Sequence, residues 1–501
     1  MTSAPRLMWL PPALNLALAA LQILYLGPVL AADALSLALG VTWSLAIAIA
    51  WPSLSPGNRR LGAGYLLMST GPLLMAYSRD LLLLYLGWEV VGLGLWLALT
   101  SAETNRSGRR ALALALHVPG WLLLVVALLG LAPSFVAPAG GEAQAWPLPV
   151  ALAFGCVVLA RSGCWPFNGW PSAALLPAGW SPAALLGLYC LASPFLLARA
   201  LVAAPWSPEG TWALALLGTL GLVAGATAAV SLRGARRVPA IASTHAAAAL
   251  CGLALAPGSP LAAAGAVALL VSGGLWVAAL PSLVGSGFPA VAGGWSILLG
   301  GSFGVWAIAQ AALSLGYGIL AVALLPAGAL LALSVACLSR ESSIVRRARR
   351  LAFLPVLGAA FCLFVGVFPQ ALSEWVVRPA VVAMSGGVGA LRELSPEWGL
   401  GLAAGSPSET YAALPATGMA LGVALALVAL YWLSLLLGRF AHEQSEGEAG
   451  DVGEGHGPDL NMDSILPGAE TVGGWLDLTS LLAKAAPRLP RALVPRDNGP
   501  P

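Results

Sequence analysis

One carboxylate lies in the middle of a long apolar segment of the sequence. Glu89 has apolar or small residues on both sides within residues 77–101. A hydrocarbon core about 30 Å thick needs about 20 helical residues, so a helix from about Asp80 to about Thr100 places Glu89 near the bilayer centre. An ionisable group at that depth is costly and marks a functional site unless a partner explains it. The alternative is a structural Glu, held in an ion pair or hydrogen-bonded between helices.

A second charge at membrane depth stands beside two Trp-Pro pairs. Arg161 precedes Pro166 and Pro171 within the apolar segment 148–177, which is too long for one simple helix. Proline removes a backbone donor, and in lipid a broken helix survives only where it packs against protein or lines a cavity. We therefore predict a helix broken near Pro166, with Arg161 beside an ion site of the kind found in transporters. The alternative is a kink that improves packing, with Arg161 reaching a polar edge.

These two charges are expected to contact each other, because each alone would be uncompensated in the bilayer. Three further residues are candidates for a proton or charge pathway, namely His117, His245 and Arg236. The two histidines lie in predicted spans. Arg236 belongs to an arginine cluster at 233–237 that most simply anchors the membrane interface.

The composition of the 501-residue chain is that of a protein that crosses a membrane many times. Hydrophobic residues make up 59% and charged residues 9%, against roughly 25% charged in a soluble domain. The apolar segments lack the alternation of barrel strands, so they are predicted to be helices. The six cysteines lie in apolar segments without CxxC spacing, which favours core residues over disulfides, iron–sulfur ligands or a zinc site. No cofactor, metal or nucleic acid is predicted, and no motif makes the chain an enzyme by itself.

The arginines fall unequally on the two faces defined by successive crossings. About 14 segments are long enough to cross, and the arginine-poor face holds only Arg79, Arg199, Arg378 and Arg392. By the positive-inside rule the other face is cytoplasmic, and both termini lie there. We expect the chain in the inner (plasma) membrane of the cell.

Four segments resemble a known family in their order and spacing. They are DALSL (33–37), RDLLLLYLGWEVVGLGLW (79–96), ARSGCWPFNGW (160–170) and RGARRVPAIAST (233–244). They are similar to the antiporter-like, proton-translocating membrane subunits of respiratory complex I, a family shared with Mrp antiporters and membrane-bound hydrogenases. GWEVVGL at 87–93 is the most specific motif and is most similar to the large distal subunit. The resemblance covers about residues 33–284.

The resemblance implies an all-α polytopic fold with two inverted five-helix repeats and a broken helix in the first. The expected regions are N-terminal helices (1–60), a first repeat (61–203), a degraded second repeat (212–338), C-terminal helices (339–440) and a hydrophilic tail (441–501). The tail includes a segment that either lies on the membrane or a partner, or is frayed.

The family's charged residues are only partly present. In the family the embedded Glu pairs with a Lys on the broken helix; Glu89 matches the Glu, whereas Arg161 and Arg236 stand at lysine positions. A family histidine falls on Leu185 or Leu186, and the second-repeat His and Lys fall near 271–275, where neither occurs. A buried Lys can lose its proton, but Arg stays charged. Only Glu89, His117 and His245 are therefore expected to titrate within the membrane.

Three functions agree with these observations. The first is a subunit that translocates a proton or cation through Glu89, in a complex like NADH:quinone oxidoreductase. The second is a scaffold paralogue that keeps the fold and has lost conduction. The third is the membrane half of an inorganic-carbon uptake system, against which Glu89 argues. The expected partners are other integral membrane subunits, the lipid bilayer and soluble redox or catalytic subunits.

Overall fold

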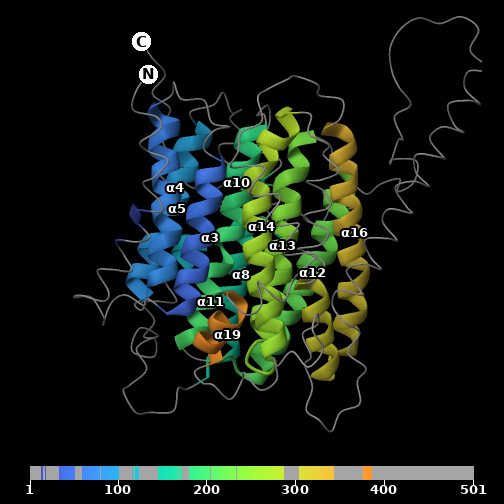
Figure 1. Ribbon diagram of the computed structural model, residues 1–501. Coiled ribbons are helices and arrows are strands. Elements are labelled where there is room, and N and C mark those ends of the chain that lie inside the picture. Colours follow the sequence, from blue (N-terminus) through green and yellow to red (C-terminus); the bar gives the residue numbers. More distant parts are fainter. Residues whose placement is uncertain are drawn as a thin grey trace, which may run out of the picture.

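The computed structural model describes residues 13–14, 17, 33–50, 59–78, 81–100, 116, 119–122, 145–168, 170–171, 180–203, 205–232, 234–286, 304–342 and 376–385. These residues form a bundle of helices that stand side by side (Figure 1). Most of the region 339–440 and the whole tail 441–501 lie outside the described residues, so the expected amphipathic segment does too.

The N-terminal part of the bundle contains α3 (Ala34–Ala50), α4 (Arg59–Tyr77), α5 (Leu81–Thr100), α8 (Leu148–Ser162), α10 (Trp180–Ala192) and α11 (Pro194–Ala203). It is followed by α12 (Pro208–Ser231), the 3-10 turn η3 (Gly234–Arg236), α13 (Arg237–Leu255), α14 (Pro260–Ser286), α16 (Gly318–Ser342) and the short α19 (Arg378–Ser385). A further helix, Gly304–Ser314, precedes α16.

Four of the described helical segments are long and apolar enough to cross a membrane. They are Ala183–Val202, Pro208–Ser231, Gly234–Leu255 and Pro260–Leu280, and five shorter apolar helices accompany them. The first combines α10 with α11, which are separated only by Ser193. The expected class, an all-α membrane protein, is confirmed. The count of about 14 crossings and the inverted repeats stay predictions.

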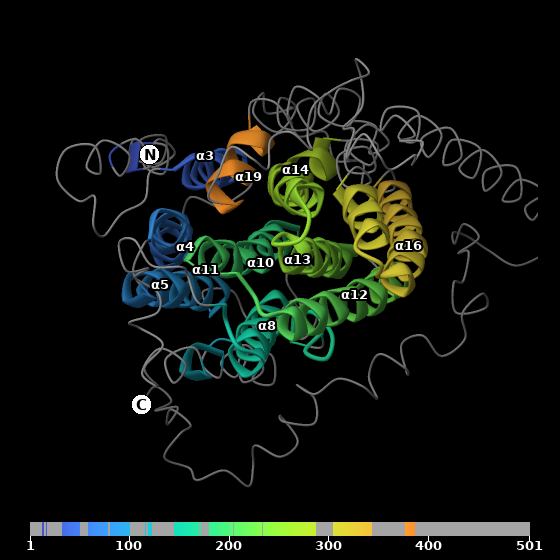
Figure 2. The same cartoon turned by 90° about the horizontal axis from the view of Figure 1, so that it is seen from below.

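Seen end-on, α10 and α13 occupy the middle of the bundle (Figure 2). Every residue of α13 except Ala240 is buried, and the apolar window of α14 is 100% buried. The helices α4, α5 and α8 lie to one side of this centre. Glu89 belongs to α5 and Arg161 to α8. Because small residues dominate α13, neighbouring helices approach it closely.

Glycines bring α4 and α5 into direct backbone contact. A Cβ on Gly94 would lie 2.6 Å from the Met68 nitrogen and 2.7 Å from the Gly64 oxygen, and a Cβ on Gly71 would lie 2.7 Å from the Gly87 oxygen. No side chain fits at such distances, so the helices pack backbone to backbone, as membrane helices with small-residue interfaces do. This packing fixes the position of α5, which carries Glu89.

Replacing one of these glycines tests the close approach. Gly94→Ala should lower the melting temperature, because the two backbones must separate; overpacking of this kind costs about 1–3 kcal/mol. Gly62→Ala is the matched control on α4: its added Cβ would meet nothing within 4 Å, and removing a helical glycine should stabilise by roughly 0.5–1 kcal/mol. Equal melting temperatures for the two variants would contradict the proposed packing.

Candidate functional site

Glu89 and Arg161 form an ion pair inside the bundle. Glu89 lies near the middle of α5 and Arg161 in the last turn of α8. The Arg161 Nη2 atom donates to Glu89 Oε1 at 3.2 Å. The Arg161 side chain is 2% exposed and that of Glu89 32%. The contact expected from the sequence is therefore present, with a fully buried cation and a carboxylate open on one side.

Backbone oxygens and aromatic rings also hold the guanidinium of Arg161. Nη1 donates to the Trp88 carbonyl, and Nη2 donates to the Leu116 carbonyl at 3.3 Å. The Arg161 Cζ atom lies 4.1 Å from the Trp88 ring centroid and 5.7 Å from that of Tyr189, distances at which a cation is attracted to a ring face. Arg161 is thus fixed by acceptors that remain in place whatever the charge of Glu89.

Two glycines leave room for the ion pair. A Cβ on Gly92 would lie 2.8 Å from Arg161 Nη2, and a Cβ on Gly120 would collide with Glu89 Oε1. Gly92 follows Glu89 by one turn of α5, whereas Gly120 belongs to a separate described fragment, 119–122. Neither glycine has a positive φ, so the pair itself explains the need for small residues here.

The collision at Gly120 gives a coupled prediction. Gly120→Ala should destabilise the protein by about 1–3 kcal/mol, the usual cost of an overpacked interior. If the added methyl group acts through the carboxylate, the same change should be nearly neutral in a Glu89→Ala background, and melting temperatures of the four proteins measure this coupling. Additive losses would show that Gly120 is needed for another reason.

The helix break beside Arg161 is stabilised by α13. Helix α8 ends at Ser162; Gly163 takes the left-handed conformation (φ 64°), and the Cys164 N–H donates back to Leu159 O at 2.9 Å. Ser243 on α13 donates from Oγ to Ser162 O at 2.5 Å. Pro166, with a cis peptide bond before it, lies in the non-helical residues 163–168. Because a bond from α13 satisfies the freed Ser162 carbonyl, the break is compatible with membrane depth.

The remaining sequence candidates do not join this pair. His245 on α13 is 1% exposed, and its Nδ1 lies 2.9 Å from Ile241 O. A carbonyl only accepts, so Nδ1 carries a proton in this contact. Nε2 has no hydrogen-bond partner among the described residues. Arg236 ends η3 with an exposed side chain. His117 lies outside the described residues.

The buried arginine at the start of α13 is the neighbour of Arg236. Arg237 is 2% exposed, and it donates from Nε to Ala229 O at 2.9 Å and from Nη2 to Val230 O at 3.2 Å. These carbonyls belong to the last turn of α12, where a cation is favourable. The arginine predicted from the sequence for the charge pathway is Arg236, whereas the one that the structure buries is Arg237.

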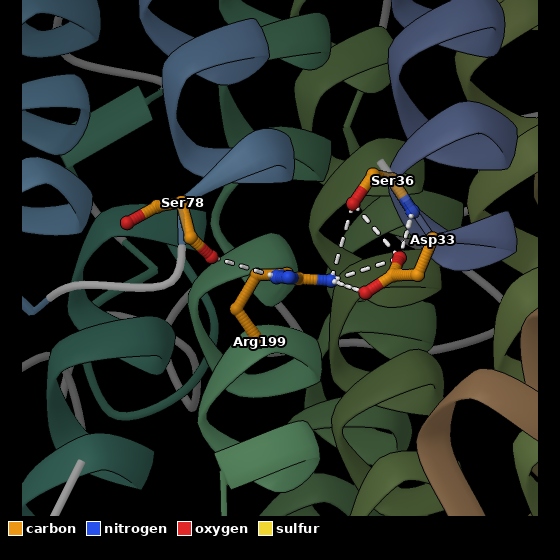
Figure 3. Close-up of polar contacts among 4 residues, drawn as sticks. All are labelled: Asp33, Ser36, Ser78 and Arg199. Carbon is orange, nitrogen blue, oxygen red and sulfur yellow. Dashed lines mark hydrogen bonds and ion pairs between the residues drawn. The ribbon is translucent and has the colours of Figure 1, made fainter. Parts of the chain in front are cut away.

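A second buried ion pair was not expected from the sequence. Arg199 on α11 contacts Asp33, which directly precedes α3, with Nη1 2.8 Å from Oδ2 (Figure 3). In the sequence, Asp33 is recognisable only as part of the DALSL motif, and Arg199 only as a basic residue of the arginine-poor face. No spacing in the sequence connects the two.

No protein-family model and no curated protein matches this sequence. Solved structures do match it. A chain of the Mrp complex from a Dietzia species has a TM-score of 0.61 at 16% identity, covering 97% of this chain and 61% of that chain. A chain of respiratory complex I from Thermus thermophilus with bound aureothin has a TM-score of 0.54 at 21% identity, covering 74% and 92%. A chain of the membrane-bound sulfane sulfur reductase, an archaeal respiratory membrane complex, has a TM-score of 0.61 at 15% identity, covering 77% and 93%.

The fold and the buried ion pair define a polytopic helical membrane protein with a charged centre. Its fold is similar to that of chains of the Mrp complex, respiratory complex I and the membrane-bound sulfane sulfur reductase. The resemblance drawn from the four sequence motifs is thereby confirmed at the level of the fold. The chain spans 61% of the length of the Mrp chain that it matches.

Proposed function

We propose that the protein is a membrane subunit of a multi-subunit ion-translocating complex, in which Glu89 is the group that accepts and releases a proton or cation. The observation that carries this proposal is the Glu89–Arg161 pair beside a broken helix. Broken helices beside buried charges form the ion sites of many transporters. The similarity in fold to membrane chains of the Mrp complex and of respiratory complex I supports the same class of function.

The two partners differ in what they can do. Arg161 keeps its charge and cannot relay a proton, so it acts as a fixed cation opposite Glu89. If Glu89 is neutralised, the guanidinium keeps its bonds to the Trp88 and Leu116 carbonyls. The Glu89 side chain can then rotate toward its solvent-exposed side while Arg161 stays in place. This division of roles suits a carboxylate that changes its charge beside a stationary counter-ion.

A scaffold role is the second candidate, and α14 favours it. The 18-residue apolar window within Pro260–Leu280 is fully buried. No residue of α14 is ionisable, and the Ser272 hydroxyl donates to Ala268 O at 2.7 Å. A proton cannot cross such an apolar stretch without a large desolvation cost. Conduction is then confined to the half of the bundle that contains Glu89, is completed by another subunit, or is lost.

The proposed function also implies which partners the protein has and in which membrane it lies. The partners are other integral membrane subunits, with soluble redox or catalytic subunits supplying the energy. The arginine distribution supports an inner (plasma) membrane location with both termini in the cytoplasm.

Proton uptake by proteoliposomes that contain the assembled complex tests the proposal. Glu89→Gln should abolish or strongly reduce uptake while the complex still assembles. Glu209→Gln, which removes an exposed carboxylate from the first turn of α12, is the control and should leave uptake unchanged. An unchanged pumping stoichiometry in Glu89→Gln would rule out translocation through Glu89 and leave the scaffold role.

A further inference from the structure

Three chain segments that are distant in sequence meet at one end of the bundle. Asp33 precedes α3, Ser78 follows α4 directly, and Arg199 lies in α11. Figure 3 shows the Arg199 guanidinium between the Asp33 carboxylate and the chain that leaves α4. Helix α4 begins at Arg59 and ends at Tyr77, so this cluster lies at the end of α4 opposite to its arginines. We refer to Asp33, Ser36, Ser78 and Arg199 as the arginine-poor-end cluster.

The contacts in this cluster join the segments directly. Arg199 Nη1 donates to Asp33 Oδ2 at 2.8 Å and Oδ1 at 3.1 Å, and Nε donates to Ser78 O at 3.1 Å. Asp33 Oδ1 also accepts from Ser36 N and Oγ, both at 2.8 Å, which caps α3. Because one guanidinium bonds both a carboxylate and a backbone carbonyl, it links α11 to α3 and to α4.

Burial distinguishes this pair from a surface salt bridge. The Arg199 side chain is 3% exposed and that of Asp33 25%, and Ser36 and Ser78 are buried. Exposed ion pairs contribute little because solvent screens them, whereas a buried charge needs its partner. Each member of the cluster therefore depends on the others to stay in place.

The cluster is mechanically connected to both partners of the central ion pair. Helix α4 packs on α5, which carries Glu89, through the contacts of Gly64, Gly71 and Gly94. Helix α11 continues α10, whose Tyr189 ring lies beside Arg161. Joining the end of α4 to α11 thus holds together, at this end, the α4–α5 unit, which carries Glu89, and the α10–α11 unit, which contacts Arg161 through Tyr189.

We propose that Asp33 and Arg199 form a latch that closes the arginine-poor end of the first repeat and shields Glu89 from that side. Arg199 is a positioning residue in this role, since it does not touch Glu89. The proposal rests on the proposed function only in taking Glu89 as the group that is shielded. Its test measures access to Glu89 and not transport, so the two can fail independently.

The test is the chemical modification of Glu89 from one side of the membrane. The full chain, in proteoliposomes, is treated on the arginine-poor side with a water-soluble carbodiimide and taurine, and the fraction of Glu89 converted to the amide is measured by peptide mass spectrometry. Arg199→Met should raise this fraction severalfold, and Arg199→Lys should raise it less, because an ammonium group can pair with Asp33 but lacks the planar fork needed to reach Ser78 O as well. Glu209→Gln, which removes an exposed charge from the first turn of α12, is the control and should have no effect.

Two results would overturn the latch. One is an unchanged modification of Glu89 in an Arg199→Met protein of normal thermal stability. The other is an equal increase from both sides of the membrane, which would indicate general loosening. If Arg199→Met does not fold, Asp33→Asn replaces it. The amide oxygen can still cap α3, whereas the charge and one acceptor for Arg199 Nη1 are lost. The absence of any increase in that variant would equally reject the proposal.

Discussion

Glu89→Gln is expected to destabilise the protein by about 3–5 kcal/mol, the usual cost of removing one partner from a buried ion pair. The change leaves Arg161, whose side chain is 2% exposed, without its counter-charge. We expect a value toward the lower end, because Gln still presents an oxygen to Nη2 and Glu89 is itself 32% exposed. Thermal unfolding of the purified protein measures the loss.

The double variant makes this prediction specific to the pair. Glu89→Gln combined with Arg161→Met removes both charges, and apolar replacement of a buried pair is often close to neutral. The Trp88 and Leu116 carbonyls lose a donor in the double variant, so some loss will remain. It should nevertheless be smaller than the loss in Glu89→Gln alone. Equal losses in the single and double variants would mean that the two charges do not stabilise each other.

The Glu89–Arg161 ion pair could be predicted from two properties of its residues, their charge and their depth in the membrane. Glu89 and Arg161 each lie in an apolar segment, and two unpaired charges in hydrocarbon would be too costly. The helix break was expected for a similar reason, since proline removes a donor. The residue at which the break begins was not expected. Helix α8 ends at Ser162 because Gly163 adopts the left-handed conformation. Nothing in the sequence separates Gly163 from the many other glycines of the chain, all of which can adopt that conformation.

Features that depend on tertiary contacts could not be predicted from the sequence. Arg199 and Asp33 lie 166 residues apart, and only the meeting of α11 with the start of α3 and the end of α4 brings them together. Gly92 and Gly120 are needed because a Cβ would lie too close to Arg161 in the first case and to Glu89 in the second. No periodic pattern in the sequence indicates such contacts. Choosing between Arg236 and Arg237 requires the orientation of α13 to within one residue, finer than helix boundaries can be assigned from sequence.

Leu275→Lys should be among the most damaging single substitutions around α14, because we expect this part of the bundle to contain no water. Leu275 is 3% exposed on α14, and neither α10, α13 nor α14 carries a carboxylate that could pair with an ammonium group. A charged side chain there loses its hydration without gaining a partner, which costs about 3 kcal/mol or more at the centre of a membrane helix. We expect poor assembly or a large drop in melting temperature.

The matched control is Ile319→Lys, in the first turn of α16, where the side chain is 86% exposed. A lysine near a helix end can extend its ammonium group toward the polar interface, so this variant should fold with little loss. The comparison separates two views of the second half. If it is dry, only Leu275→Lys is damaging. If water fills the region around α14, the two variants should be tolerated alike, and ordered water resolved along α14 would confirm that result. A continuous path through both halves would then be open to a proton, and the scaffold role would lose the observation that favours it.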